Sequence, residues 1–377
     1  MRPLSPTPIP ARCPPRTDQT AYLLPGNPRV PASVWTGMRR EIITVVAATV
    51  GAVAALLALP TTSALDAPAI NPPAVAVAVA VAVPTQQPLV PWHGPVEEIF
   101  VHPVVLRPDL AFTQDALGRG FQDYFVTARE FRSMLDGLWR HGWTLVDVHR
   151  AAAGTVRVPP GRRPVVLSED DVNYYRYFAG RGLASRLVLS GDRVLAQVGD
   201  ALTDQDVVPL VDEAVAAHPE LSADGAKGVL ALTGYEGLLG EHDVKAAHER
   251  LRALADRLRA TGWTFASHTF GHITLSRASL RSAKRDTERW RALTRELLGP
   301  VDVLVYPFGS RPSPAVRREL RDDGFTTQLD IDVRPRRDVV DGVVLMSRRH
   351  VDGLAFTQAR RLADFFDVDR VRDPARP

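Results

Sequence analysis

Four short polar clusters contain residue types that can perform acid–base or metal chemistry. They lie at 168–171 (SEDD), 267–272 (SHTFGH), 306–309 (YPFG) and 347–350 (SRRH). Each follows directly after an apolar run with the length and composition of a β-strand. In α/β barrels the catalytic groups come from loops at the carboxyl ends of the strands. We therefore expect the four clusters to meet at one end of a barrel.

His268 and His272 are four residues apart, and on a helical turn this spacing presents both imidazoles to one point. Asp171 is the carboxylate expected to join them, giving a two-histidine, one-carboxylate metal site with positions open for water. The alternative is a pair of unrelated surface histidines, and the place of both after a strand favours the metal site. Thr269 stands where an HExxH motif has its glutamate, which disfavours a zincin protease. The same ligands suit non-haem iron oxygenases, but those would leave Asp170 unexplained.

Asp170 and Asp171 are neighbours, and neighbouring side chains of an extended chain point to opposite sides. We therefore expect separate roles, in which Asp171 binds the ion and Asp170 removes a proton from water beside it. An acidic turn in which one aspartate caps a helix is the alternative. A retaining glycosidase needs two carboxyl groups about 5 Å apart across a sugar, which adjacent residues supply poorly.

Strands and helices alternate along the region that carries these clusters. Strands are expected over 99–106, 143–148, 163–167, 228–233, 263–266, 301–305 and 342–346, and helices over 127–141, 243–261 and 279–298. Thr127 and Glu130 form a capping-box pattern at the start of the first helix. Repeated βα units imply a mainly parallel sheet, and about 285 residues fit one α/β barrel better than two small domains.

The clusters SEDD, SHTFGH and YPFG, in this order, resemble the motifs of the NodB-type polysaccharide deacetylases, carbohydrate esterase family 4. The resemblance covers about 92–365. It implies a distorted (β/α) barrel that binds a divalent metal ion, Zn²⁺ or else Co²⁺, Mn²⁺ or Ni²⁺. It also implies that Asp171, His268 and His272 are the metal ligands and that Asp170 is the general base.

The resemblance further implies an oxyanion site and a proton donor. We expect the backbone N–H of Tyr306 to help hold the tetrahedral oxyanion, and His350 to deliver a proton to the departing amine. The alternative for His350 is an exposed histidine, because Arg348 and Arg349 beside it would oppose its protonation. For His102, in the first strand, a structural role is the better interpretation.

Four residues are expected to line the substrate-binding site, with the tyrosines stacking on sugar faces or else lying in the core. They are Asn173, Tyr174, Tyr175 and Pro307. Three departures from the family pattern stand out. Glu169 replaces an aromatic or aliphatic residue, and no arginine that could pair with the base precedes Tyr306. The Asp-Trp motif is missing unless Asp330 or Asp332 takes its place.

Charge and cysteine content exclude other classes of protein. The 377 residues hold 46 Lys and Arg against 43 Asp and Glu, a net charge of +3. Because no block of Lys and Arg occurs, we expect no nucleic-acid partner. Cys13 is the only cysteine, which excludes an internal disulfide framework and a cysteine-based zinc cluster.

Three segments precede the expected deacetylase domain at 92–377. Residues 1–37 are rich in Pro and Arg and predict a disordered tail. The segment 38–65 contains an uncharged apolar run typical of a secretory signal or a membrane anchor, and 66–91 is an Ala/Val/Pro low-complexity linker. A start at Met38 favours the signal, and a start at Met1 favours an anchor.

Arg39 and Arg40 precede the apolar run, so we expect that side to stay in the cytoplasm and the rest of the chain to be exported. The sequence thus predicts a secreted or membrane-anchored, metal-dependent hydrolase. It would remove N-acetyl or O-acetyl groups from an envelope or extracellular polysaccharide. Two alternatives stay open: an amidase or deformylase acting on a small non-sugar amide, and a glycan-binding envelope protein without catalytic activity.

Overall fold

The computed structural model describes residues 88–377. The tail predicted at 1–37, the signal or anchor at 38–65 and all but the end of the linker at 66–91 lie outside the described residues. Within the described part, no helix has the length and apolar character needed to cross a membrane.

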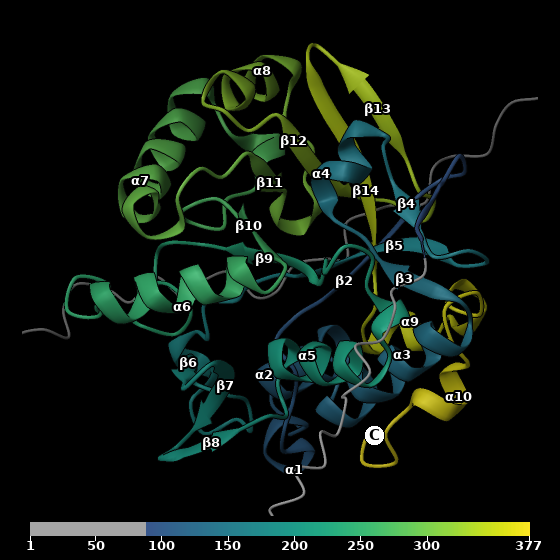
Figure 1. Ribbon diagram of the computed structural model, residues 1–377. Coiled ribbons are helices and arrows are strands. Elements are labelled where there is room, and N and C mark those ends of the chain that lie inside the picture. Colours follow the sequence, from purple (N-terminus) through teal and green to yellow (C-terminus); the bar gives the residue numbers. More distant parts are fainter. Residues whose placement is uncertain (1–87) are drawn as a thin grey trace, which may run out of the picture. The chain divides into compact units, whose positions relative to one another are not determined.

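Seven parallel strands form a closed barrel (Figure 1). In order around the barrel they are β2 (Glu97–Val101), β5 (Arg163–Glu169), β9 (Gly228–Leu232), β10 (Trp263–Ser267), β11 (Val303–Val305), β12 (Thr327–Ile331) and β14 (Val343–His350). Pairing of β14 with both β12 and β2 closes the circle. This is the (β/α) barrel that the alternating pattern and the motif resemblance predict.

The barrel is distorted because two of its strands change partners along their length. The first half of β5 pairs with β3 (Trp143–Leu145), and its last two residues, Ser168 and Glu169, pair with β9. Likewise, β13 (Arg337–Val340) runs antiparallel to the first half of β14, whose last two residues pair with β2. The barrel wall is therefore continuous at its carboxyl end, where the predicted site lies.

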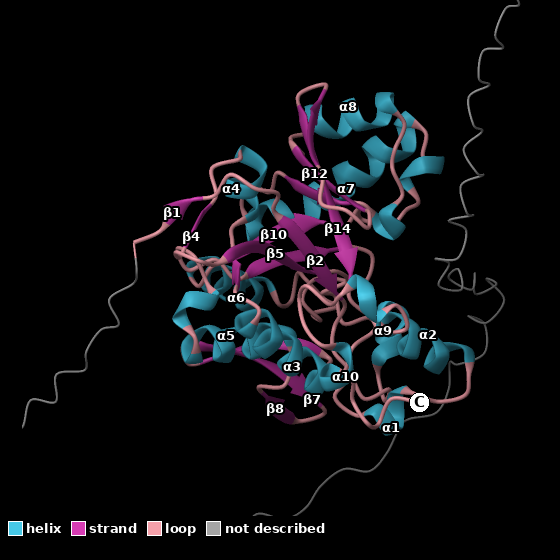
Figure 2. Cartoon of the chain, turned by 90° about the vertical axis from the view of Figure 1, so that its right-hand side faces the viewer, coloured by secondary structure: helices cyan, strands magenta, loops and turns pink. Residues whose placement is uncertain are grey.

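Helices cover the outside of the barrel (Figures 1 and 2). The longer ones are α2 (Ala116–Tyr124), α3 (Ala128–Arg140), α5 (Val207–Ala217), α6 (His248–Ala260), α7 (Leu280–Leu298) and α8 (Pro314–Asp322). Strand side chains alternate between two cores: Leu167 and Leu232 pack outward beneath the helices, whereas Val166 and Ala231 point inward. Burying each leucine contributes about 1.5–3 kcal/mol.

The remaining elements are short. Two small antiparallel sheets consist of β1 (Val90–Pro91) with β4 (Arg157–Val158), and of β6 (Arg186–Ser190), β7 (Arg193–Val198) and β8 (Ala201–Thr203). Short helices are α1 (Pro108–Ala111), α4 (Val148–Ala153), α9 (Gly353–Phe356) and α10 (Val368–Val371). Strand β1 begins at Val90, within the end of the linker predicted at 66–91.

Most of the predicted elements are confirmed, with shifted ends. The strand predicted over 99–106 ends at Val101, because Pro103 lacks the N–H that a ladder needs. Strand β12 was not predicted, because its sequence TQLDI carries polar residues on the outward face. These are Gln328, which accepts a hydrogen bond from the Tyr306 hydroxyl, and Asp330, which is paired with arginines.

Candidate active site

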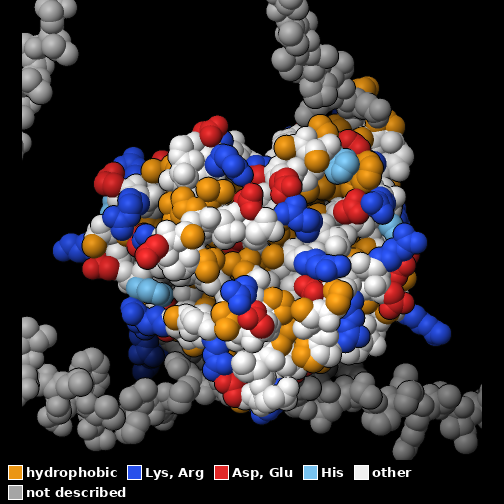
Figure 3. Space-filling view, turned by 90° about the horizontal axis from the view of Figure 1, so that it is seen from below, with side chains coloured by type: hydrophobic (Ala, Val, Ile, Leu, Met, Phe, Trp, Pro, Cys, Tyr) orange, Lys and Arg blue, Asp and Glu red, His pale blue; other side chains and the backbone are white. Residues whose placement is uncertain are grey.

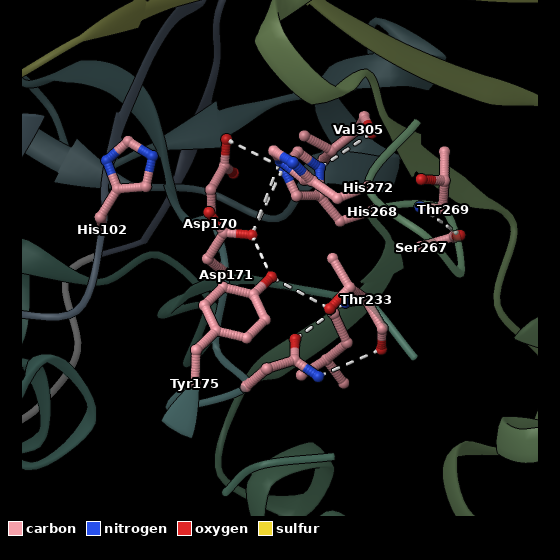
Figure 4. Close-up of polar contacts among 12 residues, drawn as sticks. His102, Asp170, Asp171, Tyr175, Thr233, Ser267, His268, Thr269, His272 and Val305 are labelled. Carbon is pink, nitrogen blue, oxygen red and sulfur yellow. Dashed lines mark hydrogen bonds and ion pairs between the residues drawn. The ribbon is translucent and has the colours of Figure 1, made fainter. Parts of the chain in front are cut away.

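The polar residues predicted to carry chemistry meet at the carboxyl end of the barrel (Figure 4). Asp170 and Asp171 follow β5, His268 follows β10, and His102 follows β2. Figure 4 shows the imidazoles of His268 and His272 pointing toward the two carboxylates.

Asp171, His268 and His272 each offer one donor atom, and the three donor atoms lie within 4.8 Å of one another. Asp171 Oδ1 is 3.7 Å from His272 Nε2 and 3.9 Å from His268 Nε2. These distances are too long for hydrogen bonds. The donor atoms therefore converge on a shared space without bonding each other, which is the arrangement expected of ligands to one cation.

A loop, not the predicted helical turn, brings His268 and His272 together. Both carboxylate oxygens of Asp286, on α7, accept hydrogen bonds from this loop, from the N–H groups of Phe270 (2.6 Å) and Gly271 (2.9 Å). The Thr269 hydroxyl accepts another from the N–H of Ile273 at 3.0 Å. The prediction of helical geometry is wrong because these local contacts give the loop its own course.

The loops of the site hold an unusual backbone. Among the described residues, five of the eight non-glycine positions with positive φ lie in them: Asp171, Tyr174, Thr269, His272 and Phe308. Such conformations cost about 1–3 kcal/mol each and cluster at functional sites. The surrounding hydrogen bonds must therefore hold these five residues in a backbone conformation that non-glycine residues disfavour.

The protonation states of the three residues suit a metal ion. The His268 Nδ1–H donates to the carbonyl of Val305 at 3.0 Å, which leaves Nε2 free to act as a ligand. Burial lowers the pKa of His272 to about 4, so this imidazole is neutral at neutral pH. Burial alone would raise the pKa of Asp171, but His272 and His268 lower it below its usual value. A neutral His272, an available His268 Nε2 and an ionised Asp171 are a donor set that suits a divalent ion.

Asp170 has an arginine partner that the sequence analysis missed. Arg348 is fully buried and donates to both Asp170 oxygens, at 2.6 and 2.9 Å. Burial would raise the pKa of Asp170, but Arg348 and His268 lower it to about 2. The arginine sought before Tyr306 therefore comes from β14. Alternation along that strand was the available signal, because Arg348 is two residues from the inward-facing Met346.

His102 was interpreted as structural, and its ring lies beside Asp170 at the edge of the site (Figure 4). Its Nδ1 is 3.0 Å from the carbonyl of Tyr124, which fixes the ring. His102 also acts to lower the pKa of Asp170 and of Asp171. His350 lies against the ring of Phe100, with the ring centroids 6.3 Å apart. Burial raises the pKa of Asp352, and His350 acts to lower it.

The role predicted for the Tyr306 backbone does not fit the structure. Its N–H already donates to the carbonyl of Leu329 at 2.9 Å, as part of the β11–β12 pairing, and cannot hold an oxyanion as well. Pro307 is buried rather than open to a substrate. The residue of this loop that contacts the site is Phe308, whose ring lies edge-on to His272 at 4.5 Å.

Two of the predicted substrate-binding residues are structural. Asn173 is buried, and its amide joins the loops after β5 and β9 by accepting from Thr233 N–H (2.9 Å) and donating to the carbonyl of Gly237 (2.5 Å). Tyr174 is also buried, with its hydroxyl on Asp206 at 2.8 Å. Their polar groups are used inside the protein, so the prediction that they touch substrate is wrong for both.

Glu169, which replaces an apolar residue of the motif that this segment resembles, lies on the outer face of β5. Its carboxyl group is completely buried, and neither oxygen has a hydrogen-bond partner in the described structure. Burial, with Asp206 and Asp170 nearby, raises its pKa well above the usual value. Glu169 therefore occupies an apolar position as a neutral acid.

Comparison with known proteins finds similar solved structures at low sequence identity. No family model and no curated protein sequence matches the chain. The Streptococcus pyogenes deacetylase PplD in complex with acetate is 13% identical, with a TM-score of 0.42 over 71% of this chain and 98% of that one. IcaB from Ammonifex degensii is 15% identical, with a TM-score of 0.45 over 72% of this chain and 98% of that one. A de-N-acetylase from Aggregatibacter actinomycetemcomitans is 14% identical, with a TM-score of 0.43 over 69% of this chain and 96% of that one. We base the functional proposal on the site geometry.

Proposed function

We propose that the protein is a metal-dependent hydrolase that removes acetyl groups from an N-acetylated polysaccharide. One observation carries the proposal: Asp171, His268 and His272 converge at the carboxyl end of the barrel, beside an Asp170 held by Arg348. A divalent ion held by these three residues would supply Lewis-acid activation of the amide and a nucleophilic water near neutral pH, and Zn²⁺ is the first candidate. The motif resemblance points to the same class of reaction.

Asp170 has the position and the charge of a general base. Its Oδ2 is 4.0 Å from His268 Nε2, so the carboxylate borders the space shared by the three candidate ligands. Arg348 binds both of its oxygens and keeps the group ionised at neutral pH. Asp170 would accept the proton of the attacking water in an orientation that Arg348 fixes.

His102 is the better candidate for the proton donor, in place of His350. Its ring is held through Nδ1 by the Tyr124 carbonyl, which leaves Nε2 for a substrate. Figure 4 shows His102 on the opposite side of Asp170 from His268 and His272, the two candidate histidine ligands. A donor there would reach the departing amine while Asp170 serves the water.

The test combines metal content with acetate release from acetylated chito-oligosaccharides and peptidoglycan. We expect His268→Ala to lose the ion and the activity together. Asp170→Asn should keep the ion and lose activity by about 10²- to 10⁴-fold, the usual contribution of general acid–base catalysis. His248→Ala, on the surface of α6, is the matched control and should change neither.

Two results would contradict this function. A wild-type protein that binds no divalent ion, or an Asp170→Asn variant with full activity, removes the mechanism. Turnover of small acetylated amides without any turnover of glycans favours the small-amide hydrolase, and glycan binding without any turnover favours the binding protein.

We also propose that the enzyme works outside the cytoplasm. The support is the apolar run at 42–59 preceded by Arg39 and Arg40. Cell fractionation of the full chain with a C-terminal tag should place it in the membrane or outside the cell. Recovery only from the cytoplasm would contradict the export proposal without affecting the hydrolase proposal.

A further inference from the structure

Tyr177 and Tyr235 are the only exposed aromatic side chains of the part of the chain described by the structure. Their exposed fractions are 41% and 40%, whereas the other described aromatic residues are buried or partly buried. Aromatic rings bring more favourable free energy on burial than most side chains, so leaving two of them in solvent forgoes stability. An exposed aromatic pair in one place is typical of a binding surface.

Both exposed rings stack on the same buried residue. The ring of Tyr175 is 5.4 Å from that of Tyr177 with an interplanar angle of 17°, and 5.1 Å from that of Tyr235 with an angle of 19°. The hydroxyl of Tyr175 donates to Asp171 Oδ1 at 2.6 Å. The stack therefore runs from a candidate metal ligand to the protein surface.

Neighbouring loops hold this stack in place. Tyr175 and Tyr177 follow β5, and Tyr235 follows β9, its partner in the barrel. The Arg176 N–H donates to Glu236 Oε2 at 2.8 Å and ties the two loops together. Because the rings are already ordered, a ligand that packs on them pays little additional conformational entropy.

The chemistry of the pair suits a sugar ring. A pyranose has a flat face of C–H groups and a rim of hydroxyls, which matches an aromatic face with a phenolic O–H at its edge. The phenol groups of both tyrosines stay protonated at neutral pH, so they can donate hydrogen bonds to a ligand. A charged ligand finds no complementary charge on the two rings themselves.

We propose that Tyr177 and Tyr235 form a sugar-binding subsite that stacks on a pyranose ring next to the one whose acetyl group is removed. The inference rests on the proposed function, and it adds that the protein recognises the sugar ring next to the acetylated one through these two tyrosines. Short acetylated substrates would reach the metal site but not the tyrosine pair.

Binding is measured by calorimetry with N-acetylchitotetraose on the full chain after removal of metal with a chelator, so that neither turnover nor metal loss affects the result. Tyr177→Ala and Tyr235→Ala should each weaken binding about fivefold, since an aromatic contact contributes about 0.5–1.5 kcal/mol. Tyr235→Phe keeps the stacking face and should stay within about twofold of wild type. Val339→Ala, 62% exposed on β13, is the control and should not change binding.

In the metal-loaded enzyme the two alanine variants should raise KM for the tetramer by a larger factor than KM for N-acetylglucosamine. Alanine variants that bind the tetramer like wild type overturn the subsite, even if the enzyme is active. A wild-type protein that does not bind the tetramer overturns it as well. Tyrosine-dependent binding without acetate release from any glycan retains the subsite and contradicts the proposed hydrolase.

Discussion

Tyr175 connects the candidate metal ligand to the loop network around it. Its hydroxyl donates to the Asp171 oxygen that faces both histidines, and the Thr233 hydroxyl lies 3.0 Å from the Tyr175 oxygen. Groups that hydrogen-bond to metal ligands fix the ligand's orientation, and their loss commonly weakens metal binding by 10- to 100-fold. Tyr175 is thus a positioning residue for Asp171.

We predict that Tyr175→Phe lowers the affinity for a divalent ion by about tenfold, because Asp171 loses the hydrogen bond that orients it. Competition with a fluorescent chelator measures the change. Tyr174→Phe is the matched control: its hydroxyl binds Asp206 and not a metal ligand, so only the free energy of unfolding should fall. Equal metal affinity for Tyr175→Phe and wild type would contradict a positioning role.

Residue types and spacing identified part of this site. The motif order led to the aspartates and to both candidate histidine ligands, because each stands directly after an apolar strand. Arg348 was missed, because its role depends on which strands become neighbours when the barrel closes. Asn173 and Tyr174 were misjudged because a polar residue after a strand can equally tie two loops together.

At the scale of the elements, β2 carries a buried acid into the barrel. Glu98 is buried on the same face of β2 as Phe100, whose ring packs against the Arg348 guanidinium, and its Oε2 has no hydrogen-bond partner in the described structure. Burial raises the pKa of Glu98 to about 8, although Arg348 acts to lower it. The folded protein therefore holds Glu98 as a neutral acid at neutral pH.

This raised pKa makes stability depend on pH. The folded state keeps the Glu98 proton up to about pH 8, whereas the unfolded state releases it near pH 4.5. The contribution of this carboxyl group to the free energy of unfolding is therefore fully present below pH 4.5 and is lost as the pH rises to about 8. We predict that Glu98→Gln increases the free energy of unfolding relative to wild type by a few kcal/mol at pH 8.5, but not at pH 5.

Urea unfolding at the two pH values measures the difference. The control is Glu249→Gln on the exposed side of α6, which should show the same small effect at both. A Glu98→Gln effect that does not change between pH 5 and pH 8.5 would show that this carboxyl group is not neutral in the folded barrel.

The strand and helix pattern predicted the architecture better than the details within it. Apolar runs marked six of the seven barrel strands, since both faces of these strands are buried. Strand β12 lacked that signal because Gln328 and Asp330 are buried through hydrogen bonds and ion pairs. Helix α3 was predicted closely, because the capping box of Thr127 and Glu130 is a local interaction.

At the scale of the whole molecule, the surface mixes charges of both signs. Figure 3 shows acidic and basic side chains interspersed around apolar patches on one face. Many arginines are engaged with carboxylates, as Arg186 is with Glu241 and Arg317 with Asp341. The positive and negative charges of the sequence are therefore also balanced locally on the surface. Each surface ion pair contributes little to the free energy of unfolding.

One ion pair links distant parts of the chain and is buried. Arg376 donates to both oxygens of Glu130, at 2.7 and 2.6 Å, and to the carbonyl of Phe125 at 2.7 Å. Asp373 accepts from the hydroxyl of Thr127 at 2.8 Å. The end of the chain thus lies against α3, the helix that precedes β3 (Figure 1).

We predict that Arg376→Ala lowers the free energy of unfolding by about 3–5 kcal/mol, because it leaves the fully buried Glu130 charged and unpaired. Arg370→Ala, an exposed pair with Asp367, is the control and should cost less than about 1 kcal/mol. Adding Glu130→Gln to Arg376→Ala should restore part of the loss, since no buried charge then remains. Denaturant unfolding of the four proteins gives these values. If the double variant is no more stable than Arg376→Ala, packing of the last residues rather than charge pairing holds this end of the molecule.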